Sequence, residues 1–334
     1  MSSERKENPL SATALRCRNC ETEHALEAVG VCSQCWGPLD PVYDRDQLAR
    51  TVTREAIEAG PASLWRYTAL LPVDAPREQR LAPGLTPLVR APRLAEVVGV
   101  GELYLKLETA NPTHSFKDRV VAVATAKAQE LGLTTLACSS TGNLANAVAA
   151  RAAAEGLDAA VFCPADLEPE KLTATAVYGA TLYAVEGTYD DCSRLTIELS
   201  FELPWAFVNV GLRSYYAEGS KTLAYEVAEQ LGWELPDVIV CPIASDRATV
   251  SGRTGRTAPP SANAVATGAQ PAAWAPTRRG TCPATTSRSS SSENPWCSFE
   301  YSEPLAIGQT ITSGSSQPSC SATSYASVFE PSAE

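Results

Sequence analysis

The sequence lacks any run of about 18 apolar residues, and its first residues lead into no apolar core of a secretory signal. These two absences predict a cytoplasmic protein with no membrane partner. Positive charge is also scarce, because 27 lysines and arginines stand against 38 aspartates and glutamates, a net charge of -11. A protein with such an acid excess repels nucleic acid over long range. The composition therefore favours a small-molecule ligand over nucleic acid.

The last quarter of the chain lacks lysine and contains few large apolar residues. Residues 246–334 contain no lysine, and only 8 of these 89 residues are Leu, Ile, Val or Phe, whereas 17 are Ser and 9 are Pro. Such a segment has too little apolar surface to offset its chain entropy. We therefore predict that residues 246–334 form a disordered tail, and we expect residues 1–15 to be disordered as well.

The composition of this tail has two possible origins. Its bias toward Ser, Arg, Ala, Pro and Thr is typical of GC-rich coding DNA that is read out of frame, so one hypothesis is a frameshift near codon 246. The alternative is a genuine fusion of a truncated domain to a disordered tail.

Four of the eleven cysteines have a regular spacing. Cys17 and Cys20 form one C-x2-C pair, Cys32 and Cys35 form another, and eleven residues separate the pairs. Two turns of this kind bring four thiolates to one tetrahedral Zn²⁺, and a reducing compartment disfavours disulfides. The spacing predicts a structural zinc ribbon over residues 16–40. Unrelated reduced cysteines or a redox pair are the alternatives, although no βαβ pattern surrounds them.

The middle of the chain alternates between strand-like and helix-like segments. Residues 41–83 read as a helical connector, and residues 84–245 read as an α/β domain with a smaller subdomain at about 133–215. Short apolar strands that alternate with longer helices indicate mostly parallel sheets covered by helices. The predicted strands are 103–107, 134–138, 159–163, 181–185, 205–209 and 237–241, and the predicted helices are 118–131, 144–155, 171–178, 189–203 and 218–231.

One lysine lies where a loop enters a helix, in the segment Asn111-Pro-Thr-His-Ser-Phe-Lys-Asp-Arg119. A lysine becomes a nucleophile when it is positioned and partly neutral, and burial and nearby positive charge supply those conditions. Lys117, with Arg119 beside it, is the candidate. The alternative interpretation is that Lys117 is an ordinary surface lysine. In the same segment, His114 is a candidate for loop packing or for acid-base work.

Two further strand-to-helix junctions carry candidate binding residues. The turn Ser139-Ser-Thr-Gly-Asn143 presents backbone N–H groups and a positive helix end, which suit a carboxylate. Simple helix capping is the alternative. In residues 209–222, Arg213, Ser220 and Lys221 suit a phosphate ester at a helix start, unless they are ordinary surface residues.

Together these segments resemble the threonine synthase family over about residues 16–245. The resemblance implies a pyridoxal-phosphate enzyme with the tryptophan synthase β-like fold, in which Lys117 binds the cofactor covalently. It also implies that O-phosphohomoserine and water give threonine and phosphate. A homodimer is common for this fold, but the oligomeric state cannot be read from the sequence. The residues that the resemblance implies to bind ligands are Asn143 and Gly142 for the cofactor, Ser140 and Thr141 for the substrate carboxylate, and Arg213, Ser220 and Lys221 for the substrate phosphate.

The resemblance leaves other functions open. Cysteate synthase and threonine or serine dehydratase are related enzymes, and an inactive remnant or a zinc-ribbon interaction protein is the non-enzymatic alternative. In the family, the segment at 241–245 runs on into a glycine-containing loop that binds the cofactor phosphate, whereas Asp246 follows here. If the tail is genuine, the fold is incomplete, and we expect weak cofactor binding and little activity.

Overall fold

The computed structural model of the protein describes residues 12–244, 247–252 and 263–267. These residues belong to one compact unit, and a second unit, residues 271–325, lies outside the described part of the chain. Within the described ranges, no helix is long and apolar enough to cross a membrane. The disorder predicted for residues 1–11 and 268–334 falls outside the described residues, as does the expected break at residues 245–246.

A small antiparallel sheet begins the described chain. Its strands are β1 (Ala14–Cys17), β2 (Glu23–His24) and β3 (Leu39–Val42), in the order β2-β1-β3. This sheet extends the predicted ribbon by two residues at each end. Ala14 and Leu15, which we expected to be disordered, lie in β1 because the Leu15 side chain is completely buried in the core.

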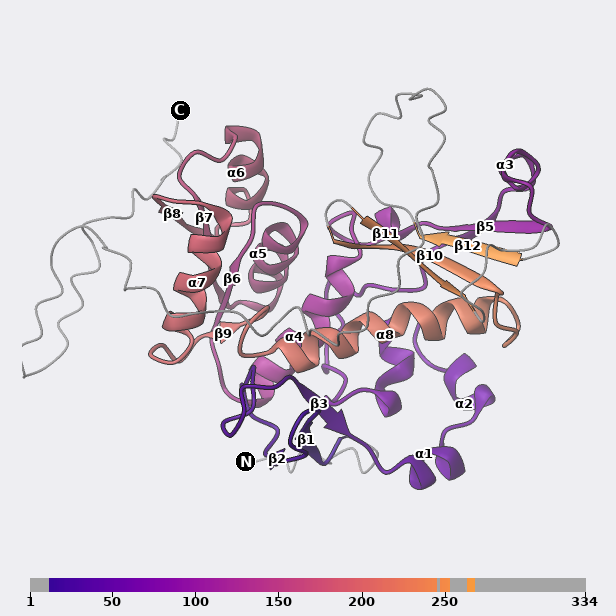
Figure 1. Ribbon diagram of the computed structural model, residues 1–334, viewed down its shortest axis with the longest axis horizontal. Helices are drawn as coiled ribbons and strands as arrows, with labels where there is room; N and C mark the ends of the chain where they lie inside the picture. Colours follow the sequence, from indigo (N-terminus) through magenta and orange to yellow (C-terminus); the bar gives the residue numbers. More distant parts are fainter. Residues whose placement is uncertain (1–11, 245–246, 253–262, 268–334) are drawn as a thin grey trace, which may run out of the picture. The chain divides into compact units, whose positions relative to one another are not determined.

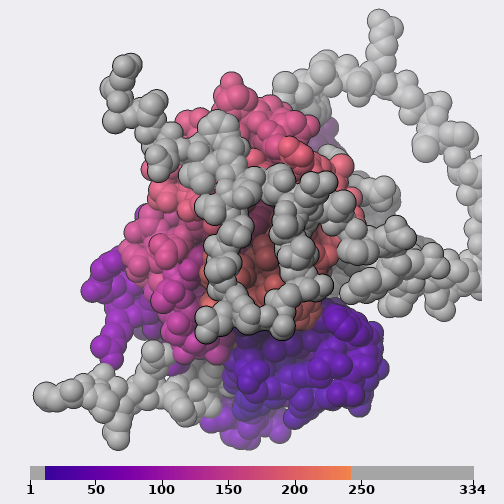
Figure 2. Space-filling view, turned by 90° about the vertical axis from the view of Figure 1, so that its left-hand side faces the viewer, coloured from indigo at the N-terminus to yellow at the C-terminus, as the bar shows by residue number. Residues whose placement is uncertain are grey.

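The connector is helical, as the sequence predicts. It contains α1 (Arg45–Thr51), α2 (Arg54–Glu58) and a 3-10 helix, η1 (Leu64–Leu70). Their first turns are capped by the side chains of Asp44, Thr53 and Ser63, each of which accepts a bond from a backbone N–H group. In Figure 2, the ribbon and the connector appear as an indigo lobe.

The predicted subdomain at 133–215 contains a four-stranded parallel sheet in the order β8-β7-β6-β9 (Figure 1). Alternate residues along these strands enter two different apolar clusters, one shared with α5 and one shared with α7. Helices therefore cover both faces. The elements are β6 (Thr135–Ser139), α5 (Asn143–Glu155), β7 (Asp158–Pro164), α6 (Pro169–Ala176), β8 (Thr181–Val185), α7 (Tyr189–Leu199) and β9 (Ala206–Phe207).

A second sheet of five strands has the order β11-β10-β12-β5-β4. The inner strands β10, β12 and β5 are parallel, and the edge strands β11 and β4 are antiparallel to their neighbours. The elements are β4 (Leu88–Arg90), α3 (Pro92–Val98), β5 (Glu102–Lys106), β10 (Val238–Ala244), β11 (Arg247–Gly252) and β12 (Asn263–Thr267).

Two of these strands correct the predicted tail. We expected disorder from residue 246 onward, yet β11 pairs with β10, and β12 lies between β10 and β5. The physical reason is backbone pairing: β12 satisfies the facing edges of two strands that are far apart in the sequence. The short β-branched stretches at 249–250 and 265 suit such strands.

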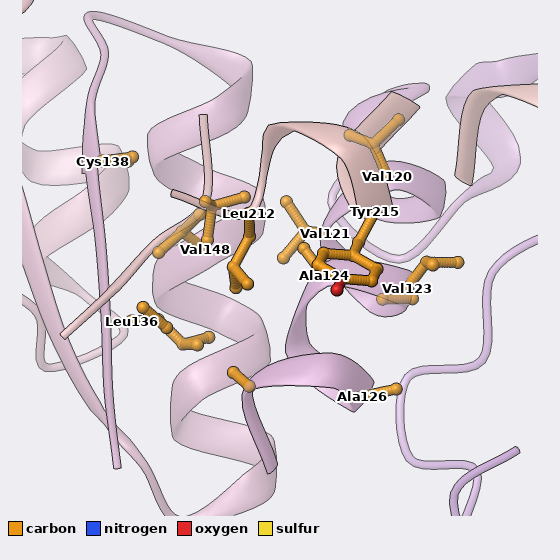
Figure 3. Packing of buried hydrophobic residues seen from close by; sticks show 14 of the residues in the cluster. Val120, Val121, Val123, Ala124, Ala126, Leu136, Cys138, Val148, Leu212 and Tyr215 are labelled. Carbon is orange, nitrogen blue, oxygen red and sulfur yellow. The ribbon is translucent and has the colours of Figure 1, made fainter. Parts of the chain in front are cut away.

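Two long helices form the centre of the molecule, α4 (Lys117–Glu130) and α8 (Arg213–Gln230). They pack closely at Gly219, where an added Cβ atom would lie 2.7 Å from the Val120 Cα atom and 2.8 Å from the Arg119 carbonyl oxygen. Only glycine permits this approach. Figure 3 shows the core beside it, in which Val121 of α4 and Leu212 lie near α5.

Candidate functional site

The loop before α4 is held by its own side chains. The Asp118 carboxylate accepts bonds from the Thr113 N–H (2.8 Å) and hydroxyl (3.0 Å) groups, and the Asn111 amide donates to the Glu108 carboxylate (2.9 Å) in η2 (Glu108–Ala110). The Ser115 hydroxyl accepts a bond from the Lys117 N–H group (3.2 Å). These bonds fix the backbone from which the Lys117 side chain extends.

Lys117 is the first residue of α4, and its side chain reaches α8. The Lys117 Nζ atom donates to the Tyr216 hydroxyl and lies 5.1 Å from the centre of the Tyr216 ring. Among the described residues, no carboxylate forms an ion pair with Lys117. Lys117 is a half-buried residue, and an electrophilic ligand can bind its amine without first breaking an ion pair to a described carboxylate. The sequence did not reveal Tyr216 as its partner.

His114 does not contact this lysine. Its side chain is exposed, and its Nδ1 atom lies 3.1 Å from the Thr109 carbonyl oxygen. The residue has a φ of 61°, the left-handed conformation that favours glycine. His114 therefore forms part of the backbone turn of this loop. Of the two roles considered from the sequence, loop packing and acid-base work, this position agrees with loop packing.

The turn between β6 and α5 leaves the helix start open. Gly142 precedes α5, and among the described residues no side chain caps the helix and no atom lies within 4 Å of the position of an added Cβ atom at Gly142. The Ser140 hydroxyl accepts a bond from the Gly142 N–H group (3.3 Å), while Asn143 is exposed. The first N–H groups of a helix need hydrogen-bond partners, and no described side chain caps this helix. The helix start therefore suits an anionic ligand, and simple helix capping does not account for the turn.

A polar cluster lies directly behind this turn. The Ser139 hydroxyl contacts the hydroxyls of Thr196 (3.2 Å) and Ser193 (3.4 Å), and the Asn209 amide donates to it (3.3 Å). The Asn209 Oδ1 atom is buried and has no hydrogen-bond partner in the described structure. Buried polar atoms are nearly always paired, so this acceptor is free to bind a ligand group.

The structure separates Lys221 from the other two residues that we predicted to bind phosphate. Because α8 begins at Arg213, five residues before the predicted start, Ser220 and Lys221 lie inside the helix and not at its first turn. Arg213, Tyr216 and Ser220 follow the i, i+3, i+7 spacing of one helical face. Lys221 faces elsewhere: its Nζ atom lies 2.5 Å from the Glu218 carboxylate and 5.1 Å from the centre of the Tyr43 ring.

The four predicted cysteines come together in the ribbon. All four Sγ atoms lie within 4.8 Å of one another, and Cys17 and Cys35 are 3.4 Å apart. The edge of a tetrahedron with Zn–S bonds of about 2.3 Å is about 3.8 Å long, so the four atoms fit such an ion.

A buried cluster of four charges is the largest feature that the sequence did not predict. The Arg119 guanidinium pairs with Glu108 of η2 (2.7 Å) and Glu226 of α8 (2.7 Å), and Lys106 of β5 also pairs with Glu226. All four side chains are at most 3% exposed. Burial acts to raise the pKa of Glu226, but Arg119 and Lys106 outweigh it and lower that pKa.

Comparisons with known proteins agree with this arrangement. A family described as pyridoxal-phosphate dependent enzymes matches residues 79–288, a span that includes Lys117, the 139–143 turn and α8. The chain is 38% identical to the threonine synthase of Methanosarcina acetivorans over 232 residues, and 34% identical to that of Methanocaldococcus jannaschii over 230 residues. These alignments cover 69% and 68% of this chain, and 56% of each relative.

The chain thus spans little more than half the length of the curated relatives that it matches. Among solved structures, the apo form of diaminopropionate ammonia lyase from Escherichia coli aligns with 46% of this chain and 50% of its own, at 24% identity and a TM-score of 0.42.

Proposed function

Because the chain belongs to the family of pyridoxal-phosphate dependent enzymes, we propose that it is a threonine synthase-like lyase that converts O-phosphohomoserine and water to threonine and phosphate. The identity of 34–38% with threonine synthases supports this reaction over others in the family. The observation that carries the proposal is the amine of Lys117, which lies at the start of a helix against a neutral hydroxyl and has no ion-paired carboxylate in the described part of the chain.

The described residues fit the aldehyde and ring of the cofactor, whereas the loop expected for its phosphate, after residue 245, lies outside them. Lys117 is a half-buried residue whose amine can take the cofactor's aldehyde, and Gly142 and Asn143 lie at a helix start that no described side chain caps. The unpaired Asn209 Oδ1 atom offers an acceptor behind the same turn. When bound, pyridoxal phosphate supplies an electron sink for the carbon atoms of the substrate.

The remaining steps belong to the side chains and backbone of this chain. The open N–H groups of α5, with Ser140 and Thr141, bind and orient the substrate carboxylate. The amine of Lys117, once free, moves protons at Cα and Cβ of the substrate. Arg213 and Ser220, which share one helical face, are the candidates for the substrate phosphate. The Lys221 side chain lies against Glu218 and Tyr43.

We further propose that Cys17, Cys20, Cys32 and Cys35 hold a structural Zn²⁺. A site with four thiolates has no open position for a substrate, so its role is to hold the ribbon together. The metal is therefore separate from the reaction proposed for Lys117.

The test begins with the whole chain and pyridoxal phosphate. Borohydride reduction followed by peptide mass spectrometry is expected to find the cofactor on Lys117, and Lys117→Ala is expected to remove it. Phosphate release is then measured from O-phosphohomoserine and from O-phosphoserine, with a loss of about 100-fold or more in Lys117→Ala. Cofactor fixed mainly on another lysine would overturn the site, and release from O-phosphoserine alone would overturn the substrate.

A further inference from the structure

We propose that Tyr216 is a positioning residue whose hydroxyl holds the free amine of Lys117 where it acts. The two residues are 99 positions apart in the sequence, and their side chains meet between α4 and α8. The proposal rests on the proposed role of Lys117 as the lysine that binds the cofactor. It adds a specific partner to that lysine, one that neither sequence motif contains.

The backbone around Tyr216 is held from two sides, so its hydroxyl has little freedom. On one side, the Ser214 hydroxyl donates to the Leu39 carbonyl (2.8 Å) in the ribbon. On the other side, Gly219 lies against the backbone of α4. Tyr216 lies between these anchors, and α8 therefore presents its ring to Lys117 in a fixed position.

A tyrosine suits both protonation states of a lysine. A hydroxyl accepts a hydrogen bond from an ammonium group and donates one to a neutral amine, whereas a carboxylate holds only the ammonium. The Tyr216 side chain can therefore keep the Nζ atom in one place while the amine gains or loses a proton.

The neighbouring tyrosine provides a matched control. Tyr215 is on the same helix, but its hydroxyl contacts the ribbon and not Lys117. The experiment compares wild type, Tyr216→Phe and Tyr215→Phe, all as full-length chains. The rate at which pyridoxal phosphate attaches to Lys117 is followed over a range of pH, with borohydride trapping and peptide mass spectrometry as the readout.

We expect Tyr216→Phe to lower this rate about tenfold, the effect of one hydrogen bond, whereas Tyr215→Phe keeps the wild-type rate. The loss should be present at every pH of the series, because the hydroxyl acts by holding the Nζ atom in place. Tyr216→His, which keeps a hydrogen-bonding group on a ring, should recover part of the rate.

Three other results would have separate meanings. Wild-type rates in Tyr216→Phe at every pH would overturn the positioning role and leave the proposed function intact. Equal losses in the Tyr215 and Tyr216 variants would show a general effect on α8 and would also overturn it. If the cofactor never attaches to Lys117 in the wild type, the proposed function itself fails.

Discussion

The two ends of α8 are held by two different kinds of structure. Near its start, Ser214 and Tyr215 bond to the ribbon, whose four thiols come from residues only 18 positions apart. Near its end, Glu226 enters a buried charge cluster whose members, Lys106, Glu108, Arg119 and Glu226, span 120 positions. The first region is local in sequence, and the second is assembled only by the fold.

Ion pairs contribute unequally to the free energy of unfolding in the two regions that hold α8. The ion pair between Arg16 and Glu23 in the ribbon is about half exposed, so water screens it and its net contribution is small. In the cluster, each charge is removed from water and depends on its partners for compensation. The exposed ion pair therefore adds little to the stability of the ribbon, whereas the cluster depends on having all four charges.

The largest effect we expect is on the ribbon, from metal removal. Treating the zinc-loaded chain with a chelator under reducing conditions should remove about 10 kcal/mol of folding free energy from this region, as in isolated zinc-finger peptides. Hydrogen exchange should then rise over β1 to β3 and remain slow in α4. Cys32→Ser should also lose the metal, whereas Cys192→Ser, a buried thiol outside the ribbon, should retain it. A chain that binds no zinc when purified with zinc would contradict the proposed site.

The next largest effect should come from the charge cluster. Arg119→Met leaves Glu108 and Glu226 buried with only Lys106 to compensate them, and we expect a loss of about 3–5 kcal/mol in the free energy of unfolding. Urea denaturation followed by circular dichroism measures it. A loss below about 1 kcal/mol would mean that the cluster is no more important than an exposed ion pair.

The pH dependence of that loss gives a separate test. In the folded state Arg119 and Lys106 lower the pKa of Glu226, so this carboxylate contributes stability above its unfolded pKa of about 4.3 and loses it as the pH falls. The difference between wild type and Arg119→Met should therefore be full at neutral pH and should narrow below about pH 4. A difference that stays constant down to acid pH would assign the effect to lost packing.

A smaller effect is expected at the contact between α4 and α8. Helix propensity alone predicts that Gly219→Ala stabilises α8 by about 1 kcal/mol. The added Cβ atom would meet the Val120 Cα atom at 2.7 Å, and the backbone of α4 cannot move without disturbing the core. We therefore expect a net destabilisation of about 1–3 kcal/mol. The sign of the change in urea midpoint decides between the two effects.

Local signals explain which parts of the fold the sequence could predict. The strand predicted at 134–138 is β6, and the helix predicted at 144–155 is α5, which ends at Gly156 with a φ of 70°. The clustering of the four cysteines could be predicted equally well, because all four residues lie close together in the sequence. In these regions the periodicity and the end signals lie within a few residues of the element that they define.

Non-local contacts explain what was missed. The start of α8 has no side-chain cap, so nothing in the sequence marked Arg213 as its first residue, and the roles given to Ser220 and Lys221 rested on a later start. The rotation of α8 is set by its packing at Gly219, and that rotation decides that Tyr216 faces Lys117. The strands β11 and β12 form by pairing with β10 and β5, which no local pattern shows.

The smallest effect, and the one that sharpens the comparison most directly, is expected for Arg16→Met in the ribbon. The Arg16 and Glu23 side chains are 51% and 54% exposed, so losing this 2.6 Å ion pair should cost less than about 1 kcal/mol, and the cost should vanish in high salt. Arg119→Met removes the same charge with the same substitution and should be insensitive to salt, because its partners are buried. If both variants lost similar stability with similar salt dependence, burial would not be what distinguishes the two regions that hold α8.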